Sequence, residues 1–394
     1  MIKNKKKVRT GLDLFFKEHL KKFKGSNIGL VVNQASVNGN CKHAVDLFSE
    51  SKSIKLKSLF GPQHGIYGNT QDNMITWKGF VHSKLGIPVF SLYGKTRMPT
   101  EEMLSKLDFI IIDLQDVGTR IYTFIYTMAN IMSACKRFKK NIIVLDRPNP
   151  INGIQVEGNV LEPEYSSFVG LFPITTRHGM TIGELAKLFN EEFKINAALE
   201  VISMKGWERE MWFDETGLPW VLPSPNMPSV ETATVFPGTV YLEGTNISEG
   251  RGTTRPFEII GAPFIDPLKL LEVLERENLK GVFFRPHFSQ PTFSKWEGKL
   301  CGGLQIHILN RNIFKPVITG IAIIKAIYNL YPELFRWKKP PYEYVYDKLP
   351  FDVIAGTDKL RKQIMANLPT MEIEKSWKKS LSYFSKIRER YLLY

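Results

Sequence analysis

The chain has little cysteine and no long hydrophobic run, and both features exclude whole classes of protein. Three of its 394 residues are cysteines, at positions 41, 135 and 301, so neither a disulfide framework nor a Cys-x-x-Cys metal site is indicated. The most apolar long stretch, 121–138, contains threonine, asparagine and serine, which favours a buried helix over a membrane span. The start of the chain lacks the apolar segment of a signal peptide. We therefore expect a cytoplasmic protein without membrane insertion.

The sequence also lacks the short motifs that hold nucleotides, zinc or an activated serine. It contains no GxGxxG, GxxxxGK[ST], HExxH or GxSxG, and we expect no cofactor. Asp113, Asp116 and His64 could in principle hold a hard cation. Acidic side chains at strand ends more often hold loops by accepting backbone N–H bonds, so no metal site is predicted.

The chain carries an excess of positive charge, which raises the question of a nucleic-acid partner. Lys and Arg number 53 against 39 Asp and Glu, a net charge of +14. Much of the excess lies near the two ends, within 3–9 and 375–390, and no aromatic residues are interleaved with it in a nucleic-acid-binding motif. We interpret it as solvated basic surface that favours anionic ligands weakly through its long-range field, and expect no nucleic-acid partner.

Short β-branched apolar runs, most of them followed by a cluster of polar residues, predict a parallel sheet. The runs span residues 28–32, 55–60, 88–92, 109–112, 142–145 and 199–203. The segments between them are able to form the crossover helices that parallel strands require. We predict a Rossmann-like, doubly wound α/β domain, in which ligands bind at the carboxyl ends of the strands.

A second, smaller α/β domain is expected after a connection rich in Trp and Pro, residues 207–237. We place the boundary near Ser229, which gives domains of residues 9–229 and 230–394. The second should contain helices at 267–277 and 317–329 and strands at 282–285 and 304–308. Upstream, 152–177 reads as a loop-rich segment. Thr181 and Glu184 have the spacing of a capping box, which leaves His178 as the functional candidate of that stretch.

The polar residues of both domains fit sugar chemistry better than nucleotide chemistry. Glycoside cleavage needs a protonated carboxyl, usually with a second carboxylate. The carboxyl candidates are Asp113, Asp116, Asp146, Glu243 and Glu249. The candidates for sugar hydroxyl contacts are Asn33, Gln63, Asn149, Asn226 and Asn246. Arginines that could grip a ligand carboxylate are Arg120, Arg147, Arg251 and Arg255. Taken singly, each Asp is better interpreted as a loop anchor and each Arg as a salt-bridge partner.

Six motifs together resemble the NamZ family, formerly the domain-of-unknown-function family DUF1343. They are LFGPQHG (59–65), DLQDVGTRIYTFIYTM (113–128), VLDRPNPINGIQVEG (144–158), SFVGLFPITTRHGMTIGELA (167–186), PSPNMP (223–228) and EGTNISEGRGTTRPFE (243–258). Characterised members are exo-β-N-acetylmuramidases, which release N-acetylmuramic acid from the non-reducing ends of peptidoglycan fragments. The resemblance implies an active site in the cleft between a Rossmann-like domain and a smaller α/β domain.

On this resemblance we assign residues to the expected site, whose ligand is a muramic-acid-containing saccharide or muropeptide. Asp116 and Glu249 are the expected catalytic carboxyls, with Glu243 in reserve and His64 orienting them. Arg120 and Arg251 are expected to hold the lactyl carboxylate of muramic acid. The full expected substrate-binding set is Asn33, Arg120, Tyr122, Arg147, Asn149, Asn226, Asn246, Arg251 and Thr253. The sequence predicts no oligomeric state.

One residue departs from the family pattern. Many members read PEHG where this chain reads Pro62-Gln63-His64-Gly65, and that Glu is a favoured catalytic candidate. Gln63 cannot donate or accept a proton in that role. In one interpretation, Gln63 binds a hydroxyl while another carboxyl acts. The alternative hypothesis is therefore a non-catalytic or differently acting sugar-binding protein on the same scaffold.

Overall fold

The structure is a computed structural model that describes residues 7–72 and 74–394. Its largest sheet has seven strands in the order β3-β4-β2-β1-β5-β6-β9. The bounds are β1 Asn27–Val32, β2 Lys55–Gly61, β3 Phe80–Val81, β4 Pro88–Ser91, β5 Phe109–Asp113, β6 Asn141–Leu145 and β9 Ala198–Ile202. All neighbours pair in parallel except β3 and β4. The six predicted parallel strands are confirmed, in the Rossmann order 3-2-1-4-5-6 when numbered among themselves.

Both faces of this sheet are buried, which explains why its strands read as continuous apolar runs. In β5, Ile110 and Ile112 pack into the core that includes residues of α4 (Phe124–Arg137) and α5 (Ile182–Glu191). Ile111 points the other way, into a core shared with Phe15 and with Phe48 of α2 (Ala44–Glu50). The remaining helices of this part are α1 Gly11–Leu14 and α3 Glu101–Leu104. The segment 11–23 consists of α1, a π-helical turn at Phe15–His19 and a 3-10 turn at Leu20–Phe23.

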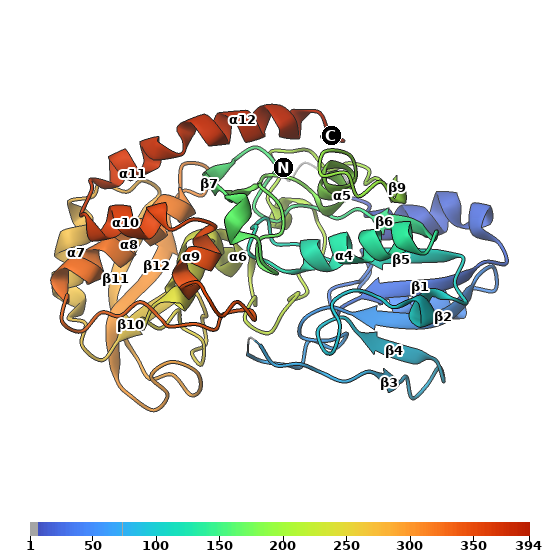
Figure 1. Ribbon diagram of the computed structural model, residues 1–394, viewed down its shortest axis with the longest axis horizontal. Helices are drawn as coiled ribbons and strands as arrows, with labels where there is room; N and C mark the ends of the chain where they lie inside the picture. The colour runs from blue at the N-terminus through green and yellow to red at the C-terminus, as the bar shows by residue number, and fades with distance from the viewer. Residues whose placement is uncertain (1–6, 73) are drawn as a thin grey trace, which may run out of the picture.

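The second part of the chain builds a three-stranded antiparallel sheet and most of the helices to the left in Figure 1. Its strands are β10 Ile259–Ala262, β11 Val282–Ser289 and β12 Cys301–Ile308. Its helices are α6 Val230–Thr239, α7 Pro267–Glu275, α8 Pro316–Leu330, α9 Pro350–Ala355, α10 Lys359–Met365, α11 Thr370–Ser376 and α12 Lys378–Glu389. The loop-rich segment contains a further strand pair, β7 Glu157–Val160 with β8 Thr175–Arg177.

The expectation of an irregular connection up to residue 237 was wrong at its end, because α6 begins at Val230. The hydroxyl of Ser229 accepts the backbone N–H of Thr232 at 3.1 Å and caps the helix. Pro237 lies within the last turn, and tight packing overrides its low helix propensity. A Cβ on Gly238 would lie 1.8 Å from the carbonyl oxygen of Pro316, so only glycine allows α6 to cross α8 this closely.

Two buried charged side chains from the sheet domain join it to the helices of the second part. The guanidinium of Arg120, which follows β5, donates to the carbonyls of Ile354 and Ala355 at the end of α9, at 2.9 and 2.7 Å. It also donates to two carbonyls of its own domain. The carboxyl of Glu157 in β7 accepts the first backbone N–H groups of α8, with Ile318 at 2.9 Å. Each contact satisfies helix-end groups that would otherwise lack partners.

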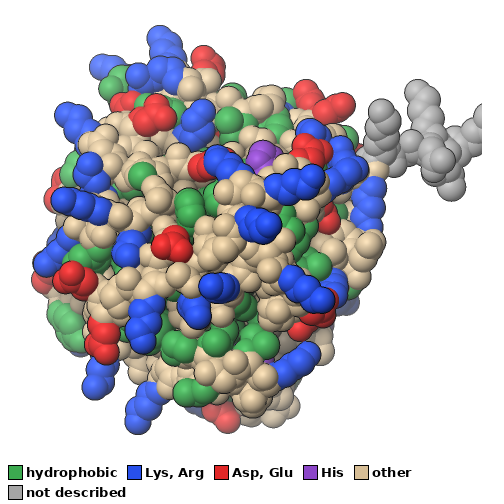
Figure 2. All heavy atoms as spheres, turned by 90° about the vertical axis from the view of Figure 1, so that its right-hand side faces the viewer, with side chains coloured by type: hydrophobic (Ala, Val, Ile, Leu, Met, Phe, Trp, Pro, Cys, Tyr) green, Lys and Arg blue, Asp and Glu red, His purple; other side chains and the backbone are tan. Residues whose placement is uncertain are grey.

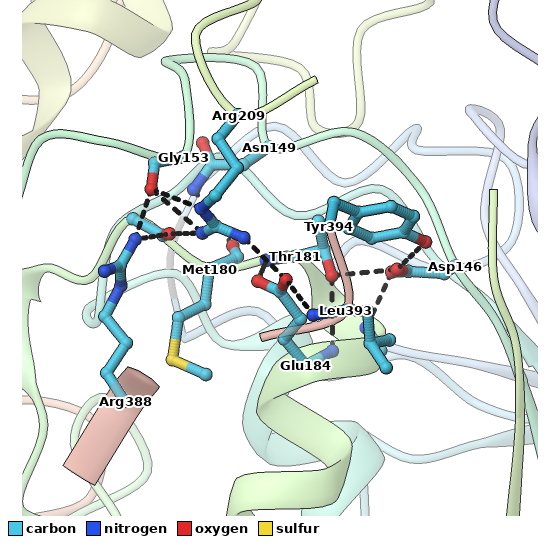
Figure 3. Close-up of polar contacts among 12 residues, drawn as sticks. Asp146, Asn149, Gly153, Met180, Thr181, Glu184, Arg209, Arg388, Leu393 and Tyr394 are labelled. Carbon is cyan, nitrogen blue, oxygen red and sulfur yellow. Dashed lines mark hydrogen bonds and ion pairs between the residues drawn. The ribbon is translucent and has the colours of Figure 1, made fainter. Parts of the chain in front are cut away.

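The C-terminal segment returns to the sheet domain after α12, which runs across the top of both parts in Figure 1. Figure 3 shows Arg388 reaching the carbonyl of Gly153 and the hydroxyl of Tyr394 next to Asp146, to which it donates at 2.7 Å. Arg388 also donates to the carbonyl of Gly179 at 2.8 Å. The predicted capping box is confirmed, since Thr181 and Glu184 exchange both hydrogen bonds. Glu184 also accepts the backbone N–H of Leu393. The capping box therefore helps to hold the C-terminal segment against the sheet domain.

The face of the molecule at the sheet end carries its basic side chains in a dispersed pattern. Figure 2 shows Lys and Arg scattered over the face at the sheet end of the molecule, with Asp and Glu among them. Among residues 7–72 and 74–394, no helix has both the length and the hydrophobicity that a membrane span requires.

We predict that Arg120→Met lowers the free energy of unfolding by about 2 kcal/mol or more, because buried carbonyls in both parts of the chain lose their donor. Denaturant-induced unfolding followed by circular dichroism measures this. The matched control is Arg276→Met, at an exposed position, which should change stability by less than about 0.5 kcal/mol. An Arg120→Met protein as stable as the control would contradict the assignment.

Candidate active site

A small cavity lies where the strand ends of the sheet domain meet the second part of the chain. From the sheet side it is lined by Gln63, His64, Ile121, Tyr122, Thr123, Phe124, Val169, Ser224, Asn226 and Met227. From the second part it is lined by Phe236, Val240, Glu243, Arg251, Phe257, Tyr342 and Glu343. Its volume is about 50 Å³, room for a few water molecules. Gln63 and His64 follow β2, next to the point where the order of the sheet reverses, which is the expected ligand edge.

The carboxyl of Glu343 enters this cavity from a strained two-residue turn. Tyr342 and Val345 exchange both backbone hydrogen bonds, at 3.1 and 2.9 Å, so Glu343 and Tyr344 are the central residues of a tight hairpin. Their φ angles are +44° and +66°, the left-handed conformation that such turns require and that usually selects Asn and Gly. Backbone strain of this kind concentrates at functional sites. Sequence reasoning missed Glu343.

Two side chains donate hydrogen bonds to the carboxyl of Glu343. The hydroxyl of Tyr93 donates to its two oxygens at 3.0 and 2.8 Å, and the amide of Gln63 donates at 3.4 Å. Thr123 donates to the other end of the Gln63 amide at 2.7 Å, which fixes the direction in which the amide points. Burial raises the pKa of Glu343 above its ordinary value, against the hydrogen bond from Tyr93 and the charge of Arg97. Its protonated form is therefore favoured to higher pH than in an exposed Glu.

A second carboxyl, Glu243, lies in the same cavity and is held as an ion pair. Arg251 donates to one oxygen at 2.7 Å, and the hydroxyl of Tyr342 donates to the other at 2.6 Å. Arg251 also lies 3.1 Å from Glu249. Burial opposes ionisation of this arginine, but the two glutamates raise its pKa above the ordinary value. The cavity therefore combines a carboxyl with a raised pKa and an ion-paired carboxylate, which are the two kinds of group that glycoside cleavage uses.

His64 contributes a neutral imidazole. Its Nδ1 lies 2.7 Å from the carbonyl oxygen of Thr70, which can only accept, so Nδ1 carries the proton and Nε2 is an acceptor. Burial, together with the charge of Arg251, lowers the pKa of His64 to about 4, against the Thr70 hydrogen bond. The φ of +69° at this non-glycine residue is a second strained position at the cavity.

Both carboxyls that the sequence ranked first lie outside the cavity lining. Asp116 accepts the backbone N–H of Gly118 at 2.8 Å and lies 3.3 Å from Nε2 of His178, which is the loop-anchor arrangement. Glu249 pairs with Lys295 at 2.8 Å as well as with Arg251. Burial acts to raise the pKa of Glu249, but the two cations outweigh it and lower the pKa. Glu249 therefore holds Arg251 in place and is poorly suited to donate a proton.

Several residues of the expected binding set also lie outside the cavity, because the fold uses their polar groups. Arg120 donates to the backbone carbonyls described above, and Arg147 forms a bidentate salt bridge with Asp113. Four others donate to backbone carbonyls: Asn33 to Pro223, Asn149 to Met180, Asn246 to Leu334 and Thr253 to Gly250. The expected residues that the structure brings together are Gln63, His64, Tyr122, Asn226, Glu243 and Arg251.

Two wider grooves, of about 730 and 590 Å³, lie elsewhere. Each carboxylate in their linings is paired with a lysine: Glu277 with Lys325, Glu374 with Lys315 and Glu162 with Lys359. Neither groove contains a residue of the expected site. Within the described part of the chain, no three His, Cys, Asp or Glu residues are grouped so as to hold a metal ion.

The sheet is of the Rossmann type, and a second domain that carries a carboxyl pair closes the cavity at its strand ends. This arrangement defines the class of protein as a two-domain α/β glycoside hydrolase. Comparison with known proteins agrees with this class. The family models described as "Exo-beta-N-acetylmuramidase NamZ, N-terminal" and "C-terminal" match residues 28–231 and 234–394. The chain therefore belongs to the exo-β-N-acetylmuramidase NamZ family.

Individual relatives match over nearly their whole length. The chain is 50% identical over 390 residues to the peptidoglycan beta-N-acetylmuramidase NamZ of Bacillus subtilis (strain 168), covering 99% of this chain and 92% of that protein. The crystal structures of two DUF1343 family proteins from Bacteroides fragilis NCTC 9343 superpose with TM-scores of 0.88 and 0.74. They are 34% and 29% identical, and each pairing covers 98% of this chain and 99% of the other.

We predict that the imidazole of His64 stays neutral until the pH falls to about 4, because its burial disfavours the charged form. Titration of the histidine ring signals by NMR measures this. A ring titrating at the ordinary value near 6.5 in the folded protein would contradict the prediction. The denatured chain, in which all histidines should titrate near ~6.5, is the internal reference.

Proposed function

We propose that this chain is an exo-β-N-acetylmuramidase that releases N-acetylmuramic acid from the non-reducing ends of peptidoglycan fragments, with Glu343 as proton donor. The observation that carries the catalytic assignment is the buried Glu343 carboxyl in the cavity, hydrogen-bonded by Tyr93 and Gln63. Membership of the family and the 50% identity to the Bacillus subtilis enzyme support the activity.

Glu343 has the properties that the acid step requires. Cleavage begins when a carboxylic acid protonates the glycosidic oxygen as the bond from that oxygen to the anomeric carbon breaks. The electron pair of the bond stays with the departing oxygen, which takes the proton from Glu343. A raised pKa keeps this proton available to higher pH than in an exposed Glu. The donors from Tyr93 and Gln63 then stabilise the carboxylate that the step leaves behind.

Glu243 is the group that faces the positive charge developing on the sugar. Its oxygens are fixed by Arg251 and Tyr342, so it is preorganised, as electrostatic catalysis requires. It acts either as the nucleophile or as the base that takes a proton from water, and water supplies the hydroxyl of the released sugar in both cases.

Substrate contacts come from the polar and apolar lining of the cavity. Asn226, Tyr122 and Nε2 of His64 offer donors and acceptors to sugar hydroxyl and acetamido groups. Phe124, Phe236 and Phe257 line the cavity as well and suit the apolar face of a sugar ring. A single terminal sugar is larger than the cavity of about 50 Å³, so binding requires displacement of the domains or of side chains around it.

The sugar-binding alternative, motivated by Gln63, is less well supported. The carboxyl function that Gln63 lacks is present next to it, on Glu343, at 3.4 Å. In this proposal Gln63 orients the carboxyl of Glu343 and is not itself the acid.

We predict that wild-type protein hydrolyses a chromogenic N-acetylmuramic acid glycoside and that Glu343→Gln lowers kcat by about 10²- to 10⁴-fold, the usual effect of losing a general acid. Glu372→Gln, at an exposed carboxyl, is the matched control and should retain wild-type kcat. Steady-state kinetics of the three proteins measure this.

Two results would count against the proposal. Undiminished turnover by Glu343→Gln would remove Glu343 as the acid. Ligand-induced thermal stabilisation of the wild-type protein without any turnover would favour the sugar-binding alternative.

We also predict that Tyr93→Phe shifts the alkaline limb of the pH–rate profile to higher pH. The acid must be protonated, so the rate falls as the pH rises through the pKa of Glu343. The Tyr93 hydrogen bond lowers that pKa, and its removal should raise it further. A limb that moves to lower pH in Tyr93→Phe would show that another group controls it.

A further inference from the structure

Arg97 lies in a cage of three aromatic rings beside the cavity. Its guanidinium carbon is 5.1 Å from the ring centre of Tyr93, 4.6 Å from that of Phe168 and 4.4 Å from that of Tyr344. The rings come from three separate segments of the chain. Such cation–π contacts fix the plane of a guanidinium without using its N–H groups.

The cage is continuous with the catalytic carboxyl. Tyr93 donates to Glu343, and Tyr344 is the next residue of the strained turn. Phe168 precedes Val169, which lines the cavity. The charge of Arg97 is close enough to act on the carboxyl of Glu343. Arg97 is therefore held at the rim of the site where the sugar binds.

The N–H groups of Arg97 have no partner in the described part of the chain. Its Nε is enclosed and without a hydrogen bond, and no hydrogen bond or ion pair joins its terminal nitrogens to a described residue. The other arginines proposed for the ligand are already engaged: Arg251 with two glutamates and Arg120 with four carbonyls. A half-buried, oriented guanidinium with unused donors is suited to a planar anion, which it can bind with two parallel hydrogen bonds.

We propose that Arg97 binds the lactyl carboxylate of the N-acetylmuramic acid residue and so selects this sugar over uncharged hexosamines. The inference rests on the proposed function, because the carboxylate belongs to that substrate. The lactyl group is the one anionic substituent of the sugar, and Arg97 is a cation beside the cavity lining whose donors the described residues leave unused. The aromatic cage holds the guanidinium ready, so little side-chain freedom is lost on binding.

The test compares two substrates that differ in one charge: a chromogenic N-acetylmuramic acid glycoside and its lactyl methyl ester. Wild-type protein should prefer the acid. Arg97→Gln should raise KM for the acid by about 10- to 100-fold, as expected for a lost charged hydrogen bond, and change KM for the ester little. Arg97→Lys should keep part of the preference, since it retains the charge without the paired donors.

The outcomes are separable. Absence of wild-type turnover on the acid would overturn the proposed function itself. Normal wild-type turnover with an unchanged acid preference in Arg97→Gln would overturn the Arg97 inference alone. So would an equal loss on both substrates, since that would mark Arg97 as a support for the turn at 342–345. If Arg97→Gln fails to fold, a full acid preference in Arg97→Lys would also overturn it.

Discussion

The site depends on how two buried charged side chains join the parts of the chain. Arg120 and Glu157 belong to the sheet domain, yet their partners are helix-end groups of α9 and α8. A buried donor or acceptor that loses its partner costs free energy, so the second domain has one favoured position over the strand ends. In that position Glu243, Arg251 and Glu343 meet Gln63 and His64. The proposed catalytic groups are therefore brought together by interdomain contacts that lie outside the cavity lining.

The α/β sheet could be predicted because its signal is local. A parallel strand that is buried on both faces reads as a short β-branched run, and six such runs stand out in the sequence. The errors occurred where tertiary packing outweighs propensity. Pro237 argued against a helix, whereas the close approach of Gly238 to α8 stabilises one. The strand pair β7–β8 is short and polar, so it resembled a loop.

The site could be predicted only in part, for a related reason. Gln63, His64, Glu243 and Arg251 occur in dense polar motifs, and all of them line the cavity. Asp116 occurs in an equally dense motif, but its carboxylate anchors a loop. Glu343 was missed because its position depends on a tight turn made by Glu and Tyr in place of Asn and Gly. The one available signal was a carboxyl flanked on both sides by tyrosine in PYEYVYD. Its contacts with Tyr93 and Gln63 are long-range and no local pattern encodes them.

The central claim is that the acid comes from the strained turn of the second domain. A crystal structure of Glu343→Gln with a disaccharide of N-acetylmuramic acid and N-acetylglucosamine tests it most directly. We expect the amide of residue 343 to lie within hydrogen-bond reach, about 3 Å, of the glycosidic oxygen. A glycosidic oxygen beside Asp116 or Glu249, or a disaccharide bound outside the cavity, would contradict the claim.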